Sequence, residues 1–153
     1  CEDAVNFIRD FGNVNKIDIQ NSFSDGLDVD YSHLDFENIV IFNAGNDCID
    51  FSFGEYTVQY ANLNHCSDKA ISAGEKTSAS LNSIEVLNSS IGIASKDSSL
   101  VKIEKILFNN AKNCFSAYNK KQEFWGAKII VNEHNCQPIR KYQQKYSLIE
   151  VMN

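Results

Sequence analysis

The sequence predicts an all-β fold, a parallel β-helix of about six turns, from three observations. Sliding the 153-residue chain by twenty-two positions superimposes the segment 24–44 on its neighbours. Apolar residues recur at this spacing, and the first column is Leu27, Ile49, Ile71, Ile93 and Phe115. A second column of amides ends the units at Asn21, Asn43, Asn88, Asn110 and Asn132, with His65 in the one gap. A short fixed period of this kind is typical of stacked units that cannot bury their own face alone.

Within each unit the apolar residues alternate, as in Leu27-x-Val29, Leu34-x-Phe36 and Ile39-x-Ile41. Alternation over so few residues predicts short strands rather than helix, so we expect three strands and three corners per turn. Asparagine adopts the left-handed backbone conformation that a tight corner needs. Amides stacked one strand spacing apart, about 4.8 Å, can hydrogen-bond along the stack. The amide column therefore predicts an asparagine ladder.

The domain organisation follows from where the repeat stops. Residues 1–136 follow the period, and we expect them to form the β-helix. Residues 137–153 contain the only proline, Pro138, and match no column, so we expect a C-terminal cap that protects the end of the stack. The chain begins at Cys1 and shows no comparable cap at that end, which favours a piece of a longer protein that continues upstream.

Composition narrows the function classes. With 43% apolar and 22% charged residues the chain is typical of a globular domain, and its net charge of −6 argues against a nucleic-acid partner. No apolar run is long enough to span a membrane. Three of the five cysteines, Cys48, Cys114 and Cys136, share one column, which favours small buried fillers over a disulfide framework. A bridge between Cys114 and Cys136 on adjacent turns is the less favoured alternative.

Outward-facing positions carry a gradient of charge. Because Leu27 and Val29 point inward, Asp28 and Asp30 point outward, and Asp50 follows one turn later. Lysines dominate the later turns. The predicted ligand-binding residues of this face are Asp28, Asp50, Glu75, Asp97, Tyr118, Lys120 and Lys121. Stacked carboxylates suit a hard cation, so Asp28, Asp30 and Asp50 are candidate Ca²⁺ ligands. A solvated surface that only keeps the protein soluble is the alternative interpretation.

The repeat, the ladder and the strand pattern resemble the right-handed parallel β-helix of the pectate lyase-like superfamily over residues 1–136. Four turns also resemble the active-site turns of polygalacturonase-type glycoside hydrolases. The matching segments are Phe23-Ser24-Asp25-Gly26, Asn46-Asp47-Cys48, Asp68-Lys69-Ala70-Ile71-Ser72 and Gly92-Ile93-Ala94-Ser95-Lys96. Asn46 stands where that family has an acidic residue, Lys69 where it has histidine, and Ala94 where it has arginine. The resemblance implies Asp25, Asp47, Lys69 and Lys96 as catalytic positions.

The lyases of this fold, which the chain also resembles, cleave uronate chains by removing a proton next to a carboxylate that calcium acidifies. That resemblance implies a lysine base, here Lys96 or Lys69, whose pKa falls when substrate covers it. Epimerisation of a uronate begins with the same proton abstraction. Polygalacturonase chemistry needs a proton-donating carboxyl group, which the amide of Asn46 does not supply.

Two functional hypotheses follow. The first is an extracellular or cell-surface module that binds an acidic polysaccharide on the charged outer face, with lyase or epimerase action as a further step. The second is a non-catalytic structural spacer or adhesin-type stalk. Ice binding is disfavoured because the sequence shows no threonine ladder.

Overall fold

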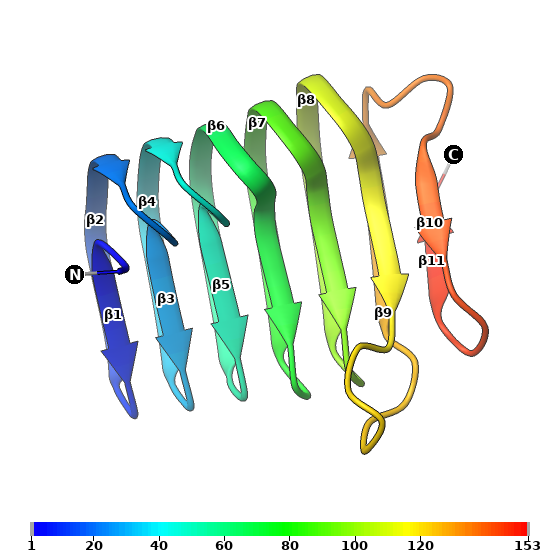
Figure 1. Ribbon diagram of the computed structural model, residues 1–153, viewed down its shortest axis with the longest axis horizontal. Coiled ribbons are helices and arrows are strands. Elements are labelled where there is room, and N and C mark those ends of the chain that lie inside the picture. The colour runs from blue at the N-terminus through cyan, green and yellow to red at the C-terminus, as the bar shows by residue number, and fades with distance from the viewer. Residues whose placement is uncertain (1, 153) are drawn as a thin grey trace.

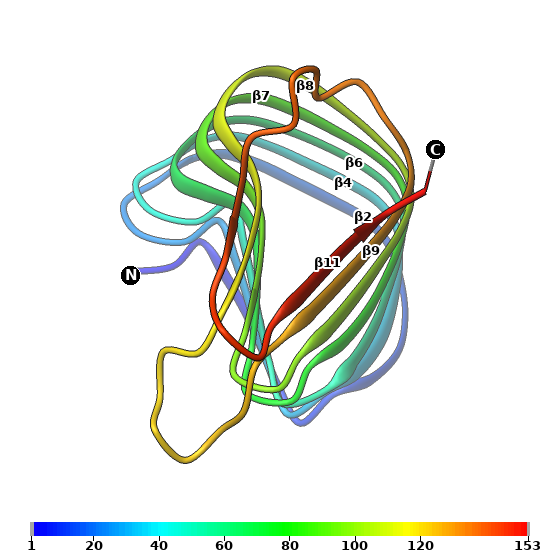
Figure 2. The same cartoon turned by 90° about the vertical axis from the view of Figure 1, so that its right-hand side faces the viewer.

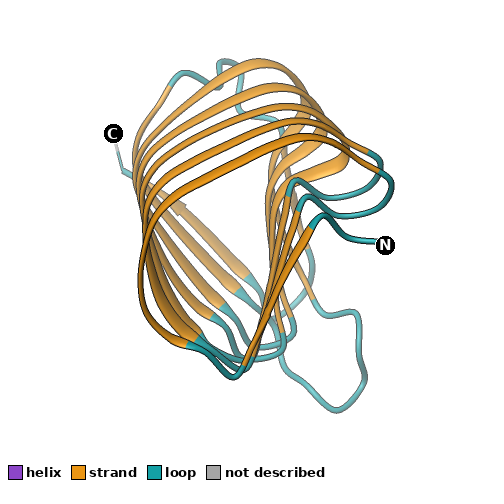
Figure 3. Ribbon diagram, turned by 90° about the vertical axis from the view of Figure 1, so that its left-hand side faces the viewer, coloured by secondary structure: helices purple, strands orange, loops and turns teal. Residues whose placement is uncertain are grey.

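A computed structural model describes residues 2–152 as a parallel β-helix of about seven turns. The end views show a three-sided coil whose layers lie almost on top of one another (Figures 2 and 3). The predicted fold class is confirmed, with one more turn than the period indicated. The strands are β1 Val5–Ile8, β2 Phe11–Ser22, β3 Leu27–Asp30, β4 His33–Ala44, β5 Ile49–Ser52, β6 Glu55–Gly74, β7 Ser78–Lys96, β8 Leu100–Tyr118, β9 Lys128–His134, β10 Lys141–Gln143 and β11 Leu148–Val151.

Each layer pairs in parallel with the layers on either side (Figure 1). In the first wall Val5 lies beside Leu27, Leu27 beside Ile49 and Ile49 beside Ile71. The predicted column then continues to Ile93 and Phe115. These side chains are fully buried from Leu27 to Phe115. The spacing of apolar residues along the sequence therefore becomes a continuous core inside the coil.

The corner columns confirm most of the amide ladder and correct two details. Asn21, Asn43, His65, Asn88 and Asn110 all have positive φ, between 57° and 66°. Asn43 Nδ2 donates to Asn21 Oδ1 at 2.7 Å, and Asn110 Nδ2 donates to Asn88 Oδ1 at 2.9 Å. At the gap, Asn88 Nδ2 donates instead to Asn64 Oδ1 at 3.3 Å, and the His65 ring Nδ1 lies 2.7 Å from the same oxygen.

Asn132 was predicted to extend this ladder, and that prediction is wrong. The corner that leads into β9 contains an insertion, so β9 pairs with β8 at a separation of 28 residues and places Asn132 beside Glu104. There its amide donates to Glu104 Oε2 at 2.6 Å. The segment 119–127, here called the corner loop, is the inserted part and projects from the coil in Figure 2.

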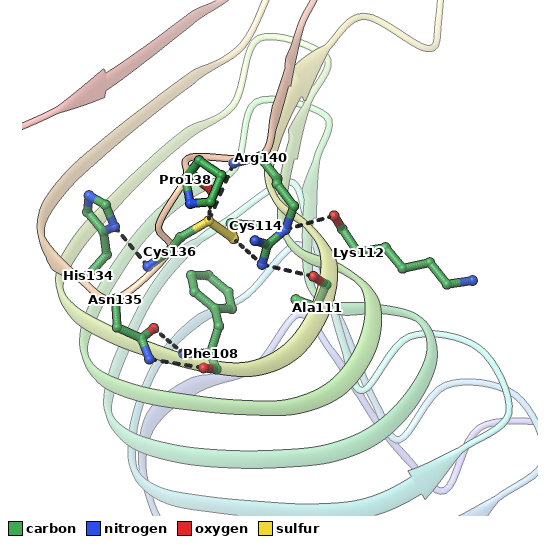
Figure 4. Close-up of a disulfide and its surroundings, with 9 residues drawn as sticks. All are labelled: Phe108, Ala111, Lys112, Cys114, His134, Asn135, Cys136, Pro138 and Arg140. Atoms are coloured by element: carbon green, nitrogen blue, oxygen red, sulfur yellow. Dashed lines mark hydrogen bonds between the residues drawn. A yellow bond between two sulfur atoms is a disulfide. The ribbon is translucent and has the colours of Figure 1, made fainter.

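The segment after Cys136 adds a seventh layer, although it matches no column of the sequence. Strand β10 pairs with the end of β8, and β11 pairs with β9 with Ile149 beside Ile129. Side chains replace missing strand partners at this end (Figure 4). Asn135 accepts from Phe108 N at 2.7 Å and donates to Phe108 O at 3.0 Å, while Arg140 donates to Ala111 O at 3.1 Å. The expectation that residues 137–153 act as a C-terminal cap segment stays a prediction.

The cysteine prediction is wrong. Two disulfides join Cys48 to Cys66 and Cys114 to Cys136. Cys48 and Cys66 come from adjacent layers that meet at one corner, where Ala44 lies beside Cys66 and Cys48 N donates to Lys69 O. Cys1 lies outside the described residues. The sequence columns missed the first bridge because its two cysteines stand at different positions of the repeat.

Candidate functional site

The charged face is the outer surface of β1, β3, β5 and the C-terminal ends of β6, β7 and β8. Leu27 and Val29 are fully buried, so Asp28 and Asp30 point outward as predicted. Adjacent layers place Asp50 beside Asp28, and Ser72 beside Asp50. The predicted outward residues therefore form one contiguous strip, in which carboxylates occupy the N-terminal layers.

A column of aspartates at the preceding corner binds backbone rather than solvent. Asp3 Oδ1 accepts from Asp25 N at 3.1 Å, and Asp25 Oδ1 accepts from Asp47 N at 2.9 Å. Asp47 Oδ1 in turn accepts from Lys69 N at 3.0 Å. Each carboxylate thus holds the corner N–H group of the next layer, which would otherwise lack a partner. Two predicted catalytic residues, Asp25 and Asp47, have this architectural role.

Lys69, the third predicted catalytic residue, is held in an ion pair. Its Nζ lies 3.3 Å from Asp47 Oδ1 and also contacts Asp68 Oδ2. Burial lowers the pKa of Lys69, but the hydrogen bond to Asp68 and the charges of Asp47 and Asp68 raise it above its ordinary value. At the other end of the pair, burial raises the pKa of Asp47 to about 6 against the opposing effect of Lys69. A lysine that holds its proton this firmly does not suit the role of general base.

The strand carboxylates differ from the corner ones because they accept no backbone N–H group from the next layer. Burial and then the charges of Asp30 and Asp50 raise the pKa of Asp28 to about 7. Burial also raises the pKa of Asp50, while Lys96 lowers it. Asp28 Oδ2 accepts from Asn6 Nδ2 at 2.6 Å, and the Ser72 side chain in the adjacent layer also lowers the pKa of Asp50. Like charges one layer apart therefore crowd Asp28, whereas Lys96 offsets part of the charge around Asp50.

Lys96, the fourth predicted catalytic residue, is only 7% exposed. Its stem lies across Gly74, where an added Cβ would lie 3.4 Å from Cε and 3.7 Å from Nζ. The missing side chain at Gly74 makes room for this lysine. Nζ has no carboxylate within 4.0 Å among residues 2–152, although its charge acts on Asp50 and Glu75. Lys96 is thus a buried cation without a direct ion pair.

Predicted ligand-binding residues near the C-terminal end of the face mostly hold the corner loop. Asp97 is fully buried, and its Oδ1 accepts from Lys120 N at 2.7 Å and from Lys121 N at 2.8 Å. Lys121 Nζ lies 2.5 Å from Glu75 Oε1, and Ser52 Oγ donates to Glu75 Oε2 at 2.8 Å. Glu75 therefore joins the loop to the third layer. Its pKa is lowered by these two bonds although burial acts in the other direction.

Tyr118 is half-buried at the C-terminal end of β8. In the pairing of β7 with β8 its partner residue is Lys96. Burial raises the pKa of its hydroxyl, and the nearby Lys69 lowers it. The charges of Asp68 and Asp47 act in the same direction as burial. Tyr118 thus lies within electrostatic range of the Lys69 cluster, so the structure brings the two predicted residues into one neighbourhood.

An aromatic stack lies along the corner that follows the charged face, and sequence reasoning missed its full extent. The rings of Tyr31 and Phe53 are parallel, with centroids 4.6 Å apart, and the Arg9 guanidinium lies 5.5 Å from the Tyr31 ring. Phe124 of the corner loop closes the stack against Phe53 at 6.2 Å. Tyr31 and Phe53 share a repeat column, whereas Phe124 lies in the insertion, where no column exists.

The carboxylates do not form a metal site by themselves. Among residues 2–152 no group of three or more histidine, cysteine, aspartate or glutamate side chains is arranged to hold a metal ion. Calcium takes six to eight oxygen ligands, so Asp28, Asp30 and Asp50 fit it poorly. Calcium binding stays a prediction. A hollow of about 680 Å³ lies elsewhere, at the C-terminal end, where Ile139, Lys141 and Met152 contribute to its lining.

Comparisons with known proteins assign no family to this chain. No family model, no curated protein and no solved structure matches the chain. In the described part of the chain no helix has the length and apolar character needed to cross a membrane.

Proposed function

We propose that this protein is a glycan-binding β-helix module of the pectate lyase-like kind, and that the charged face is its binding surface. The observation that carries the proposal is the outward-facing strip of Asp28, Asp30 and Asp50 beside the stack of Tyr31 and Phe53. Carboxylates accept hydrogen bonds from sugar hydroxyl groups, and aromatic faces pack on the apolar faces of sugar rings. A strip that crosses several layers suits a polymer rather than a small ligand.

The disulfides favour a location outside the cell. Disulfides persist in oxidising compartments, and this chain contains two. The net charge of −6 makes a nucleic-acid partner unfavourable. We therefore place the module on the cell surface or in the extracellular space.

Binding is favoured over catalysis by the way the predicted catalytic residues are used. Asp25 and Asp47 hold corner N–H groups, and Lys69 is held in its charged form. Lys96 is the remaining candidate base for lyase- or epimerase-like action on a uronate, since it has no direct ion pair. A structural spacer is the alternative function, and the corner carboxylates that serve only the fold favour it.

The proposal is tested by affinity electrophoresis against acidic, neutral and amine-bearing polysaccharides. Replacing Tyr31 with alanine removes the exposed end of the stack, and we expect binding to weaken about fivefold, which corresponds to about 1 kcal/mol. Phe42→Ala is the matched control, because Phe42 is also an exposed aromatic residue and lies on another wall, against His65. Retention by none of the polysaccharides would leave the spacer function. New absorbance from unsaturated uronate ends, lost in Lys96→Met, would establish lyase action.

A further inference from the structure

The corner that follows the charged face has the same backbone conformation in successive layers, and it lies along the lower edge of the coil in Figure 1. Its residues recur every twenty-two positions with positive φ between 48° and 59°, and they are Arg9, Tyr31, Phe53, Glu75 and Asp97. Tyr146, at this corner of the seventh layer, has φ of 69°. Side chains at equivalent positions of stacked layers lie one above the other. The column therefore begins with aromatic rings and is interrupted by two carboxylates.

Glu75 and Asp97 hold the corner loop instead of contributing rings. Asp97 Oδ1 accepts from two backbone N–H groups of the loop, at 2.7 and 2.8 Å, and Glu75 pairs with Lys121 Nζ. The loop brings Phe124 back to the corner, where its ring centroid lies 6.2 Å from that of Phe53. The loop thus supplies an aromatic ring in the layers where the corner column has carboxylates.

A second aromatic pair, Trp125 and Tyr146, lies at the end of the corner loop. The two ring centroids are 6.5 Å apart, the ring planes are at 80°, and the side chains are 76% and 73% exposed. Rings at this angle do not cover each other's faces, so each keeps a face open to solvent. Trp125 N donates to Ser98 Oγ at 2.8 Å, and Ser98 N donates to Trp125 O at 2.9 Å. The exposed pair is therefore held in a fixed position on the coil.

These rings form a continuous row, here called the aromatic file, which consists of Tyr31, Phe53, Phe124, Trp125 and Tyr146. Ring contacts or adjacent sequence positions join each member to the next. The file runs from the second layer to the seventh, which is about 24 Å at the usual strand spacing of about 4.8 Å. A protein interface buries about 800 Å² on each side, more than one row of rings at a corner offers. A linear polymer that lies along the coil matches the file in length and in width.

The charge around the aromatic file disfavours an acidic polymer. The protein has a net charge of −6, and Lys121, which was expected to attract an anionic ligand, is held in an ion pair. The cations at the two ends of the file lie over its own rings, Arg9 at 5.5 Å from the Tyr31 centroid and Lys145 at 4.8 Å from the Tyr146 centroid. These charges are therefore engaged in cation–π contacts. An uncharged polymer meets no repulsion here.

Building on the proposed glycan function, we infer that the aromatic file binds one uncharged, β-linked glycan chain along the coil axis, with Trp125 and Tyr146 as its main platform. Extended β-linked pyranose chains are ribbons with flat C–H faces, and such apolar faces pack on aromatic rings. An α-linked chain of the same sugar curves away from a straight row of rings. The ligand class therefore differs from the acidic polysaccharide that the sequence indicated.

Titration of the full chain with hexasaccharides tests the inference, because Trp125 is the only tryptophan and its fluorescence reports contacts at the platform. The probes are cellohexaose, maltohexaose and a β-linked mannuronate hexamer, so the first two differ only in linkage and the third carries charge. We expect cellohexaose to change the Trp125 emission and to bind at least about tenfold more tightly than the other two. In calorimetry, Trp125→Ala should weaken cellohexaose binding about tenfold, whereas Trp125→Phe, which keeps a ring, should retain most of it.

Phe23→Ala is the matched control, because Phe23 is 86% exposed at the corner that precedes the charged face. Unchanged cellohexaose binding by Trp125→Ala overturns the inference, as does an equal loss in the control. Tighter binding of maltohexaose or of the mannuronate hexamer also overturns it, while the proposed glycan function stands. Binding of no hexamer overturns the inference, and retention by no polysaccharide in addition overturns the proposed function.

A second copy of the chain is the competing occupant of the platform. Sedimentation that shows a dimer which Trp125→Ala dissociates would make the pair a protein contact and overturn the inference. Circular dichroism of each variant checks that the β-helix is intact.

Discussion

The corner aspartates and the strand aspartates lie three residues apart in each turn, yet they have different environments. Asp25 and Asp47 accept backbone N–H groups from the next layer, at 2.9 and 3.0 Å. Asp28 and Asp50, one layer apart in the adjacent strand, accept no backbone hydrogen bond from the neighbouring layer. A carboxylate at a corner meets a free N–H group, whereas in a strand every N–H group already belongs to the ladder. The same residue type is therefore structural in one column and available to a ligand in the other.

The largest expected effect tests the structural column. Asp47→Ala leaves the corner N–H group of Lys69 and the Lys69 ammonium without this partner, in a site where the Asp47 side chain is 3% exposed. We expect the free energy of unfolding to fall by about 3 kcal/mol, measured by urea denaturation. Asp47→Asn keeps an acceptor oxygen and should cost about half as much. Equal losses in both variants would show that the N–H bond contributes little.

A smaller effect is expected when Lys96 is replaced, and it tests whether the charge of this lysine stabilises the strand aspartate Asp50. Lys96 lowers the pKa of the buried Asp50, so Lys96→Met leaves that carboxylate without its nearest favourable charge. We expect a loss of about 2 kcal/mol at about pH 8 and a smaller loss at about pH 4, because burial raises the pKa of Asp50 and more of it is then protonated in the folded protein. Thermal unfolding at the two pH values measures the difference. A loss independent of pH would mean that only packing across Gly74 matters.

Replacing the strand aspartate Asp28 should raise the free energy of unfolding, whereas the two substitutions above should lower it. Its pKa is about 7 in the folded protein against 3.8 ordinarily, so the folded state binds the extra proton and stability falls as pH rises through this window. Asp28→Asn removes that titration. We expect it to raise the free energy of unfolding by about 1 kcal/mol, or the melting temperature by about 3 °C, at about pH 8, with no gain at about pH 4.

Asp30, Asp50, Asp3 and Asp25 are the charged groups that face Asp28, and burial acts with them. Asp35→Asn, on another wall, serves as the control and should shift stability equally at both pH values. A destabilised Asp28→Asn protein at about pH 8 would contradict the proposed crowding.

An effect of similar size to that of Asp28→Asn is expected in the amide ladder, whose side chains are neutral amides and not carboxylates. Asn43 is exposed, has φ of 65° and donates to Asn21. We expect Asn43→Ala to lower the free energy of unfolding by about 1 kcal/mol, from backbone strain and one lost bond, and Asn43→Gly to lower it by less because glycine tolerates positive φ. Chemical denaturation of both variants separates the two contributions. Equal losses in the two variants would assign the stability to the hydrogen bond, which both remove, and not to backbone strain.

Periodic features could be predicted from the sequence, and aperiodic ones could not. The outward direction of Asp28 and Asp30 follows from the alternation of Leu27 and Val29, since successive strand residues face opposite sides. The pairing of Cys48 with Cys66 does not follow, because the two occupy different columns and meet only through the path of the corner. Phe124 is a similar case, since its contact with Phe53 depends on how an insertion folds back.

The amino-acid sequence by itself determined the coil, the core and the side of each strand that faces solvent. It could do so because these properties depend on local alternation and on one fixed period, both of which are written directly in the residues. Only the tertiary structure decided which charged groups are free. Lys69 and Lys121 form ion pairs and Asp47 holds a backbone N–H group, while Asp28 forms no ion pair among residues 2–152. Partner choice depends on distances of a few ångströms between side chains of different layers, which the repeat does not specify.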